Sequence, residues 1–166
     1  MKVPFLDLQA SYLELKNEID VSIARVLESG RYIGGTEVES FEDKFSNFCG
    51  SKFTIGVGNG MDALTLSLKV LGVGTGDEVI VPANTFIATW LAVSGVGAIP
   101  VPVEPNPITY NISVSDIQKA ITSKTKAIIP VHLFGQPADL DPIIDLAKQH
   151  NLFVIEDAAQ AVGSTY

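Results

Sequence analysis

The sequence has little cysteine and no long uninterrupted apolar run. Its 166 residues contain one cysteine, Cys49, so no disulfide can form within the chain, and a reducing cytoplasm is the natural compartment. The first residues, M-K-V-P-F-L-D-L, carry Pro4 and Asp7 where a signal peptide needs an apolar core. The most apolar segment, residues 90–103, is interrupted by glycines and prolines and is too short to span a bilayer. We therefore expect a cytoplasmic protein with no membrane partner.

Positive charge is also scarce. The chain has 11 Lys and Arg residues against 19 Asp and Glu residues, a formal net charge of −8 at pH 7. Nucleic acids and anionic lipids are bound through basic surfaces, so we expect neither as a partner. A local pocket for a small phosphate is compatible with this charge. Apolar residues make up 46% of the chain, which is enough for a sizeable core.

Hydrophobic periodicity predicts alternating helices and strands. The strands are almost wholly apolar, which is typical of a parallel sheet with helices on both faces. Thr36 with Glu39 matches a capping box, and Asp141-Pro142 matches an N-cap followed by an N1 proline. The sequence therefore predicts a three-layer α/β/α domain with a mainly parallel sheet, incomplete at its C-terminus. The expected helices are 7–27, 36–48, 61–71, 86–94, 114–121 and 141–150, and the expected strands are 53–57, 78–81, 99–103, 127–133 and 153–155.

A glycine-rich turn before a predicted helix is the first candidate site. It reads G-V-G-N-G-M-D-A-L, Gly56–Leu64. Free N–H groups at Gly60, Met61 and Asp62, together with the helix dipole, favour a phosphate there. The alternative is that Asn59 and Asp62 only cap the helix, and Asp62 would add negative charge near a phosphate. The stretch is not a dinucleotide fingerprint, because methionine occupies the position of the third glycine.

Two further candidates follow predicted strand ends. In P-A-N-T-F-I-A-T-W, Phe86 is placed to stack on a planar ligand, and Asn84 and Thr85 offer polar contacts. The pattern alone favours the alternative, a helix start with a core phenylalanine. In P-V-H-L-F-G-Q, His132 is a lone histidine, which is more often structural than a catalytic base. Since no second His or Cys lies near it, we expect no zinc site.

The fourth candidate is F-V-I-E-D-A-A-Q, Phe153–Gln160, where an apolar strand ends in Glu156 and Asp157. A carboxylate at the end of a central strand is costly to bury without a partner. One alternative is a salt bridge to Lys or Arg. The other is a ligand cation such as a protonated pyridine nitrogen, whose proton the carboxylate would stabilise. No Ser-His-Asp arrangement, CxxC motif or glycosidase carboxylate pair stands out, so a hydrolase is not favoured.

Together these motifs resemble the N-terminal part of the DegT/StrS sugar-nucleotide aminotransferases, which are fold-type-I pyridoxal-phosphate (PLP) enzymes. The resemblance covers essentially all 166 residues in order. The stretches N-T-F-I-A-T-W-L-A-V-S and T-Y-N-I are most similar to enzymes that aminate the 3-keto group of a dTDP-linked 6-deoxyhexose. The motifs that carry the resemblance are Y-I-G-G-T-E-V-E-S-F-E (32–42), G-N-G-M-D-A-L (58–64), G-D-E-V-I-V-P-A-N-T-F-I-A-T (76–89), T-K-A-I-I-P-V-H-L-F-G-Q (125–136) and V-I-E-D-A-A-Q-A (154–161).

This resemblance implies roles for individual residues. Asp157 would pair with the pyridine nitrogen and keep the ring an effective electron sink. Gln160 would contact the side of the ring that carries the phenolic oxygen, and Phe86 would stack on the ring face. Glu156 is expected to make a structural contact instead. The phosphate turn would comprise Asn59, Gly60 and Met61, the last two through backbone N–H groups.

The resemblance also implies a domain division and a missing part of the site. Residues 1–30 would be an N-terminal helical segment, and residues 31–166 the N-terminal part of the PLP-binding large domain. The family's Schiff-base lysine lies in an S-F-x-x-x-K motif beyond the aspartate, and no lysine before Tyr166 matches it. We therefore predict no catalytic residue in this chain and no activity of the chain alone. The same missing stretch would supply strands between the fifth strand and the first.

The partners implied by the resemblance are a nucleotide-sugar substrate, glutamate as amino donor and a second copy of the chain in a homodimer formed through the N-terminal helices. Two alternatives to the aminotransferase stay open, and the position that would separate it from the first of them is not in the chain. One is a sugar dehydratase of the same family, in which histidine replaces the lysine. The other is a non-catalytic or truncated binding module.

Overall fold

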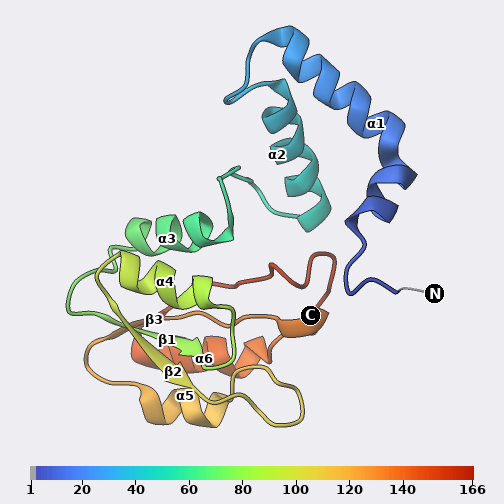
Figure 1. Ribbon diagram of the computed structural model, residues 1–166. Helices are drawn as coiled ribbons and strands as arrows, with labels where there is room; N and C mark the ends of the chain where they lie inside the picture. Colours follow the sequence, from blue (N-terminus) through green and yellow to red (C-terminus); the bar gives the residue numbers. More distant parts are fainter. Residues whose placement is uncertain (1–2) are drawn as a thin grey trace. The chain divides into compact units, whose positions relative to one another are not determined.

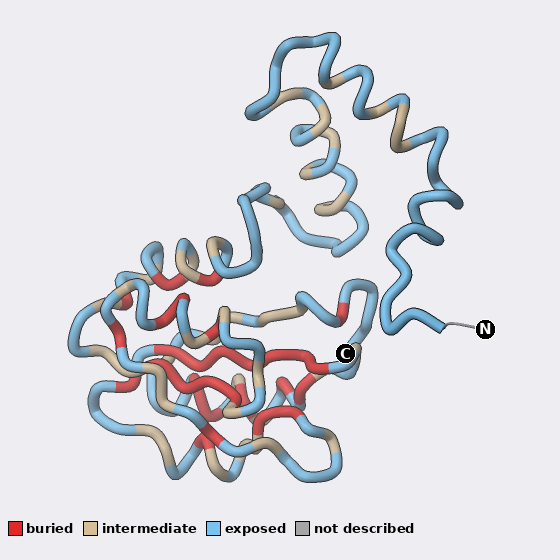
Figure 2. Tube along the Cα trace, in the orientation of Figure 1, coloured by how far each residue is buried: buried red, intermediate tan, exposed pale blue. Residues whose placement is uncertain are grey.

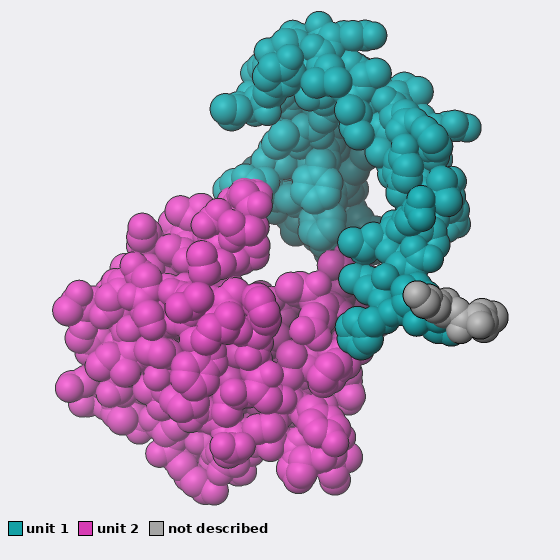
Figure 3. Space-filling view, in the orientation of Figure 1, with its two compact units in different colours: residues 1–56 teal, residues 57–166 magenta. Residues whose placement is uncertain are grey.

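The computed structural model describes residues 3–166 and divides into two compact units, Met1–Gly56 and Val57–Tyr166 (Figure 3). The assignment of residues 1–30 and 31–166 to separate domains stays a prediction. No helix in residues 3–166 has both the length and the hydropathy that crossing a membrane requires.

The first unit consists of two helices, α1 (Leu8–Ser29) and α2 (Thr36–Cys49). The Asp7 carboxylate caps α1 by accepting hydrogen bonds from the N–H groups of Gln9 and Ala10. None of residues 3–56 is buried (Figure 2). Three phenylalanine rings on α2 instead pack in a row. The ring centroids of Phe41 and Phe45 are 5.3 Å apart, and those of Phe45 and Phe48 are 6.2 Å apart.

The capping box predicted at Thr36 is wrong. Thr36 is the first residue of α2, and Gly35 occupies the N-cap with extended backbone and no side-chain hydrogen bond. The Gly35 carbonyl accepts hydrogen bonds from the N–H groups of Val38 and Glu39. The helix begins at Thr36, but its N-cap lies one residue earlier than predicted, because the Gly35 carbonyl accepts the hydrogen bond from Glu39 that was expected to go to the threonine hydroxyl.

The second unit is a three-layer α/β/α structure, as predicted (Figure 1). Its four strands are all parallel and lie in the order β2-β1-β3-β4. Helices α3 and α4 cover one face of the sheet, and α5 and α6 cover the other. The elements are α3 (Gly60–Val70), β1 (Glu78–Pro82), α4 (Ile87–Gly95), β2 (Ile99–Val103), α5 (Val114–Ala120), β3 (Thr125–Ile128), α6 (Leu140–His150) and β4 (Phe153–Val154).

Side chains that alternate along the strands build the two halves of the core. Val79 and Val81 of β1 pack in the cluster that includes Leu68 of α3. Ile80, between them, packs in the opposite cluster with Ile143 of α6. Since both faces of β1 are buried, the strand has to be continuously apolar, which explains the pattern seen in the sequence.

The strand predicted at residues 53–57 is absent from the described chain, which therefore has four strands and not five. Phe53 is 75% exposed and Ile55 is 79% exposed. The apolar, β-branched residues at 53–57 favoured an extended strand. A strand also needs a neighbour for its N–H and C=O groups, and none of β1–β4 pairs with this segment.

The strands predicted at 127–133 and 153–155 are shortened because of Pro130. The N–H of Ile155 donates to the carbonyl of Ile128, and the N–H of Asp157 donates to the carbonyl of Pro130. Between these two bonds, Pro130 has no N–H to continue the ladder. The N–H of His132 then donates to the carbonyl of Asp157, so the two segments stay side by side beyond the formal strand ends.

The start of α6 also differs from its prediction. The N-cap position is Asp139 and the helix begins at Leu140, so Pro142 is its third residue and not its first. Asp139 makes no side-chain capping bond and its carboxylate instead accepts from the Tyr166 hydroxyl at 2.9 Å. Proline is tolerated within the first turn because the N–H groups there have no intrahelical acceptor.

Candidate functional site

The strand order creates a switch point between β1 and β3. The chain leaving β1 enters α4 on one face of the sheet, whereas the chain leaving β3 enters α6 on the other face. The two loops diverge at this point, and in open α/β sheets ligands bind outside the carboxyl ends of the strands at such a point. The residues singled out in the sequence follow these strand ends or begin a helix beside them.

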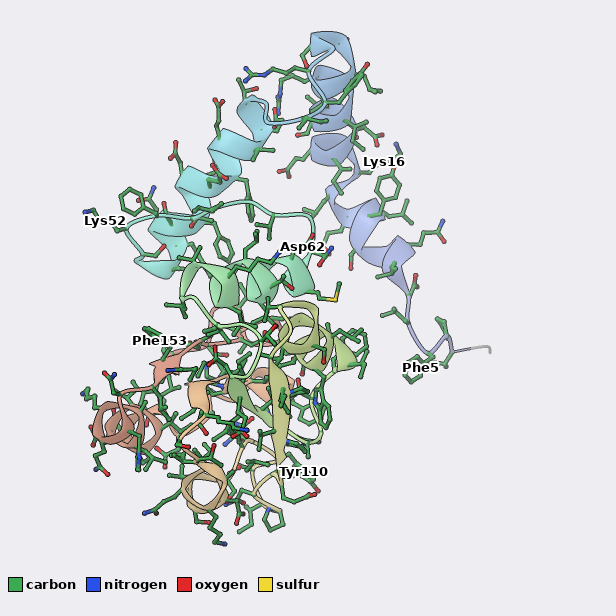
Figure 4. All side chains as sticks on the ribbon, turned by 90° about the vertical axis from the view of Figure 1, so that its left-hand side faces the viewer. Phe5, Lys16, Lys52, Asp62, Tyr110 and Phe153 are labelled. Atoms are coloured by element: carbon green, nitrogen blue, oxygen red, sulfur yellow. The ribbon has the colours of Figure 1, made fainter. Side chains whose placement is uncertain are left out.

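The start of α3 lies at this same edge. A short turn carries the end of α3 to the amino end of β1, so the helix begins beside the carboxyl ends of the strands. The Asn59 Oδ1 accepts from the N–H of Asp62 at 2.9 Å, and its Nδ2 donates to the Asp62 carboxylate at 3.0 Å. Figure 4 shows Asp62 at the start of α3. The cap predicted as the alternative is therefore present.

This cap leaves two donors unused. The N–H groups of Gly60 and Met61 have no acceptor among the described residues. A Cβ at Gly58 would lie 2.9 Å from the Asp62 carboxylate, so glycine allows that side chain to fold back towards Asn59. Two free N–H groups and a helix dipole favour an anion such as a phosphate.

Phe86 presents an exposed ring at the start of α4. It occupies the N-cap position with extended backbone and is 72% exposed, so the core location that the pattern favoured is wrong. The polar side chains before it are used within the loops. The Asn84 Nδ2 donates to the carbonyl of Tyr110 at 3.0 Å, and the hydroxyls of Thr85 and Thr89 lie 3.0 Å apart.

The two adjacent carboxylates have different surroundings. Glu156 Oε1 lies 2.9 Å from His132 Nε2. Its structural contact is confirmed, although the partner is a histidine and not Lys or Arg. The Asp157 carboxylate accepts one bond, from the N–H of Ala159 at 3.1 Å, and pairs with no cation in residues 3–166. Asp157 is therefore the carboxylate that has capacity for a ligand.

His132 is structural, as its isolation in the sequence indicated. The ring is 3% exposed, and its Nδ1 accepts from the N–H of Ala138 at 2.9 Å. Since Nδ1 is an acceptor, the ring proton lies on Nε2 and is donated to Glu156. Both nitrogens are occupied within the fold. No group of three or more potential metal ligands occurs in the described part of the chain.

Gln160 is oriented by the loop that follows β3. Its Oε1 accepts from the backbone N–H of Phe134 at 2.8 Å. Its Nε2 has no acceptor among the hydrogen bonds of residues 3–166. The structure thus brings Asp157, Gln160 and the loop after β3 together by direct bonds. The α3 turn and Phe86 share the edge by topology, and no hydrogen bond joins them to Asp157.

Two features of this edge had no assigned role at the sequence level. Asn111 is 3% exposed and bonds to the loop after β3. Phe134 and Tyr110 have left-handed backbone, with φ of 57° and 60°, and their rings lie edge to face at 6.5 Å. Asparagine in a turn carries no signal of burial, and left-handed phenylalanine or tyrosine is not predictable from residue type.

The three-layer fold is that of the large domain of PLP-dependent transferases. Residues 13–166 match the DegT/DnrJ/EryC1/StrS aminotransferase family. The chain therefore belongs to this family, whose members are PLP enzymes, and the resemblance seen in the motifs is confirmed.

Curated relatives with high identity match this chain over nearly its whole length. The chain is 56% identical to the erythromycin biosynthesis sensory transduction protein EryC1 of Saccharopolyspora erythraea, over 100% of this chain and 45% of the relative. It is 54% identical to the dTDP-3-amino-3,4,6-trideoxy-alpha-D-glucose transaminase of Streptomyces venezuelae, over 99% of this chain and 44% of the relative. The chain spans less than half the length of these relatives.

Solved structures share the fold over the same part. The S. venezuelae DesV structure, solved with a ketimine intermediate, superposes with a TM-score of 0.95 at 55% identity, covering 98% of this chain and 44% of DesV. NtdA from Bacillus subtilis, solved with the cofactor PMP (pyridoxamine phosphate), gives a TM-score of 0.92 at 40% identity, covering 99% of this chain and 38% of NtdA.

Proposed function

We propose that the protein is a PLP-dependent aminotransferase that transfers the amino group of glutamate to a keto sugar nucleotide, and that residues 57–166 supply one wall of its cofactor site. The observation that carries the proposal is the Asp157 carboxylate, which follows β4 and pairs with no cation among residues 3–166, three positions before Gln160, whose Nε2 makes no hydrogen bond in the same residues. The names of two relatives support a dTDP-linked 3-keto-6-deoxyhexose as the substrate, since each names a transaminase of a dTDP-3-amino sugar that lacks its 6-hydroxyl.

The residues present fit a pyridoxal ring and its phosphate. When bound, the cofactor supplies an electron sink for the carbon that loses its proton. Asp157 would accept a hydrogen bond from the protonated ring nitrogen, and its negative charge would keep that proton on the nitrogen. Phe86 covers one ring face and excludes water from it. Gly60 and Met61 bind the phosphate through backbone N–H groups, and Asn59 holds the turn that presents them.

No lysine of the chain is assigned a covalent role. Lys119 and Lys148 form ion pairs with Asp116 and Asp145 on the helices α5 and α6. These helices cover the face of the sheet opposite α3 and α4. We infer that residues outside this chain supply the covalent step.

We also propose that the enzyme acts in the cytoplasm as a homodimer. The single cysteine, Cys49, is exposed and unpaired in the described structure, which suits a reducing compartment. Helix α1 exposes large apolar side chains that a second copy would cover, among them Leu13, Val21 and Leu27.

Binding of PMP to the chain tests the proposal. PMP carries an amine in place of the aldehyde of PLP, so it cannot condense with surface lysines. We expect wild-type chain to bind it in a calorimetric titration, and Asp157→Asn to bind on the order of tenfold more weakly, because the charged partner of the ring nitrogen is lost. Asp145→Asn is the matched control, since that carboxylate is 69% exposed on α6.

Absence of PMP binding by the wild-type chain would contradict the proposal. Equal affinity of wild-type chain and Asp157→Asn would contradict the assignment of the ring-nitrogen partner. Circular dichroism of each variant verifies that the fold is retained.

A further inference from the structure

Two buried polar side chains hold the loop that follows β3. Asn111 and His132 are each 3% exposed. Asn111 lies after β2 and reaches the loop from outside, whereas His132 lies at the start of the loop itself. A buried amide or imidazole is retained at low cost only when its polar atoms are bonded, and here every buried side-chain N and O in the described structure has a partner.

Asn111 makes three hydrogen bonds to this loop. Its Nδ2 donates to the carbonyls of Gln136 and Pro137, at 3.0 Å and 3.1 Å. Its Oδ1 accepts from the N–H of Leu133 at 3.1 Å. The three contacts span both sides of the left-handed residue Phe134, whose φ is 57°. Such a backbone conformation persists when the surrounding structure holds it.

His132 closes the same loop at its base. Its Nδ1 accepts from the N–H of Ala138, and its Nε2 donates to Glu156, both at 2.9 Å. The backbone N–H of His132 donates to the carbonyl of Asp157 at 3.0 Å. The loop is therefore joined at its base to the residues that flank the proposed cofactor carboxylate.

The held loop determines which way the Gln160 amide faces. The N–H of Phe134 can only donate, so the atom of Gln160 that lies 2.8 Å from it is the oxygen. The amino group of the same amide then faces away from the loop. It is free to donate to an acceptor oxygen, such as the phenolic oxygen of a pyridoxal ring.

We propose that Asn111 is a positioning residue for the cofactor site: it holds the backbone of Phe134 so that the Phe134 N–H orients the Gln160 amide with its Nε2 donor towards the bound ring. The inference rests on the proposed function for the identity of the ligand. The orientation of Gln160 by the loop is a property of the free chain and is measurable without ligand.

Hydrogen exchange of the free chain tests the loop contact. In Asn111→Ala we expect the Phe134 amide to exchange on the order of tenfold faster, because the loop that holds it against Gln160 is released. The Ile129 amide, which donates to Ile80 at 2.9 Å within the sheet, reports whether the core is retained and should exchange at the wild-type rate. Asn111→Asp is the second variant, since it keeps the volume and the acceptor for Leu133 but loses both donors.

PMP affinity tests the consequence for the site. We expect Asn111→Ala and Gln160→Ala each to bind PMP on the order of fivefold more weakly. Gln160→Ala removes the Nε2 donor, and Asn111→Ala removes the contact that orients it. In the double variant Asn111→Ala/Gln160→Ala, the loss of PMP affinity should equal that of Gln160→Ala alone. Such non-additivity would show that Asn111 acts on binding through Gln160. Gln118→Ala, at an exposed position on α5, is the matched control and should bind as wild type.

Three outcomes would overturn the positioning role: an unchanged Phe134 exchange rate in both Asn111 variants, an unchanged PMP affinity in them, or losses that add in the double variant. Failure of the wild-type chain to bind PMP would instead overturn the proposed function, and the exchange rates would then still decide whether Asn111 holds the loop.

Discussion

Glu156 and Asp157 show how adjacent residues of the same charge acquire different roles. Side chains alternate along an extended segment, so the two carboxylates leave it in opposite directions. One meets the Nε2 of His132 and becomes part of the structure. The other retains its acceptor capacity apart from one bond to Ala159, and is therefore the one that can bind a cationic ring nitrogen.

Gly97 is a position where the backbone itself restricts the residue type. Its φ is +83°, and a Cβ added there would lie 2.8 Å from the Thr75 hydroxyl oxygen. We expect Gly97→Ala to lower the free energy of unfolding by about 1–3 kcal/mol, because strain and the close contact add. Urea unfolding followed by circular dichroism measures the change.

Gly95 serves as the control for this substitution. It lies two residues earlier, at the end of α4, and a Cβ there would meet no heavy atom within 4 Å. Gly95→Ala should leave stability unchanged or raise it by up to about 1 kcal/mol. If Gly95→Ala and Gly97→Ala lowered the free energy of unfolding equally, strain at Gly97 would not be the cause of the destabilisation.

At the scale of elements, the α1–α2 hairpin is held by polar contacts at the surface. The Arg25 guanidinium of α1 donates to the Glu37 carboxylate in the first turn of α2. The hydrogen bond from Arg25 holds the pKa of Glu37 below its ordinary value of 4.5, with smaller contributions from the charges of Arg25 and Lys44. Because the pKa is lower in the folded chain, the pair stabilises the hairpin above pH 4.5 and loses this effect as the pH falls below that value.

Substitution of Glu37 tests this pH dependence. We expect Glu37→Gln to lower the thermal midpoint of helical ellipticity slightly at pH 7 and to have a smaller effect at pH 3, because protonation of the wild-type carboxylate as the pH falls removes the charge that pairs with Arg25. The effect is small because both side chains face water. Glu39→Gln, in the same first turn of α2, is the control. A Glu37→Gln difference that is equally large at both pH values would exclude the ion pair as its origin.

At the scale of the whole molecule, the segment between α2 and α3 is exposed. It contains the division between the compact units and no strand pairing among the described residues. Phe53 is the large side chain there that a chymotrypsin-like protease recognises. We expect the first internal cleavage after Phe53, because cleavage needs an accessible backbone without secondary structure.

Mass spectrometry of a brief digestion identifies the first cut. Phe53→Ala should slow cleavage in this segment and leave other sites unaffected. A first cut inside α3, β1 or α4 would contradict the expectation, since these elements form the buried core of the second unit.

Much of the second unit was predictable because burial on both faces leaves a simple trace in the sequence. Val79, Ile80 and Val81 form a continuous apolar run, which indicates a covered parallel strand wherever its neighbours lie. The segment at 53–57 is also rich in apolar and β-branched residues yet is not a strand here, since pairing depends on a partner segment. The N-cap of α2 was misplaced by one residue because the Gly35 carbonyl accepts the hydrogen bond expected of the Thr36 side chain.

The amino-acid sequence by itself determined the fold class, the family and the residues at the strand ends, because apolar periodicity and contiguous motifs are local properties of the chain. The resemblance had already assigned different roles to Glu156 and Asp157, but only the tertiary structure showed the bond that occupies Glu156, which way Gln160 faces and what Asn111 contacts. These depend on hydrogen bonds between residues far apart in the chain, such as the bond from Phe134 to Gln160, 26 positions away, and the bond from Asn111 to Gln136, 25 positions away. Such contacts arise when the loops after β2, β3 and β4 meet at one edge of the sheet, which local sequence does not specify.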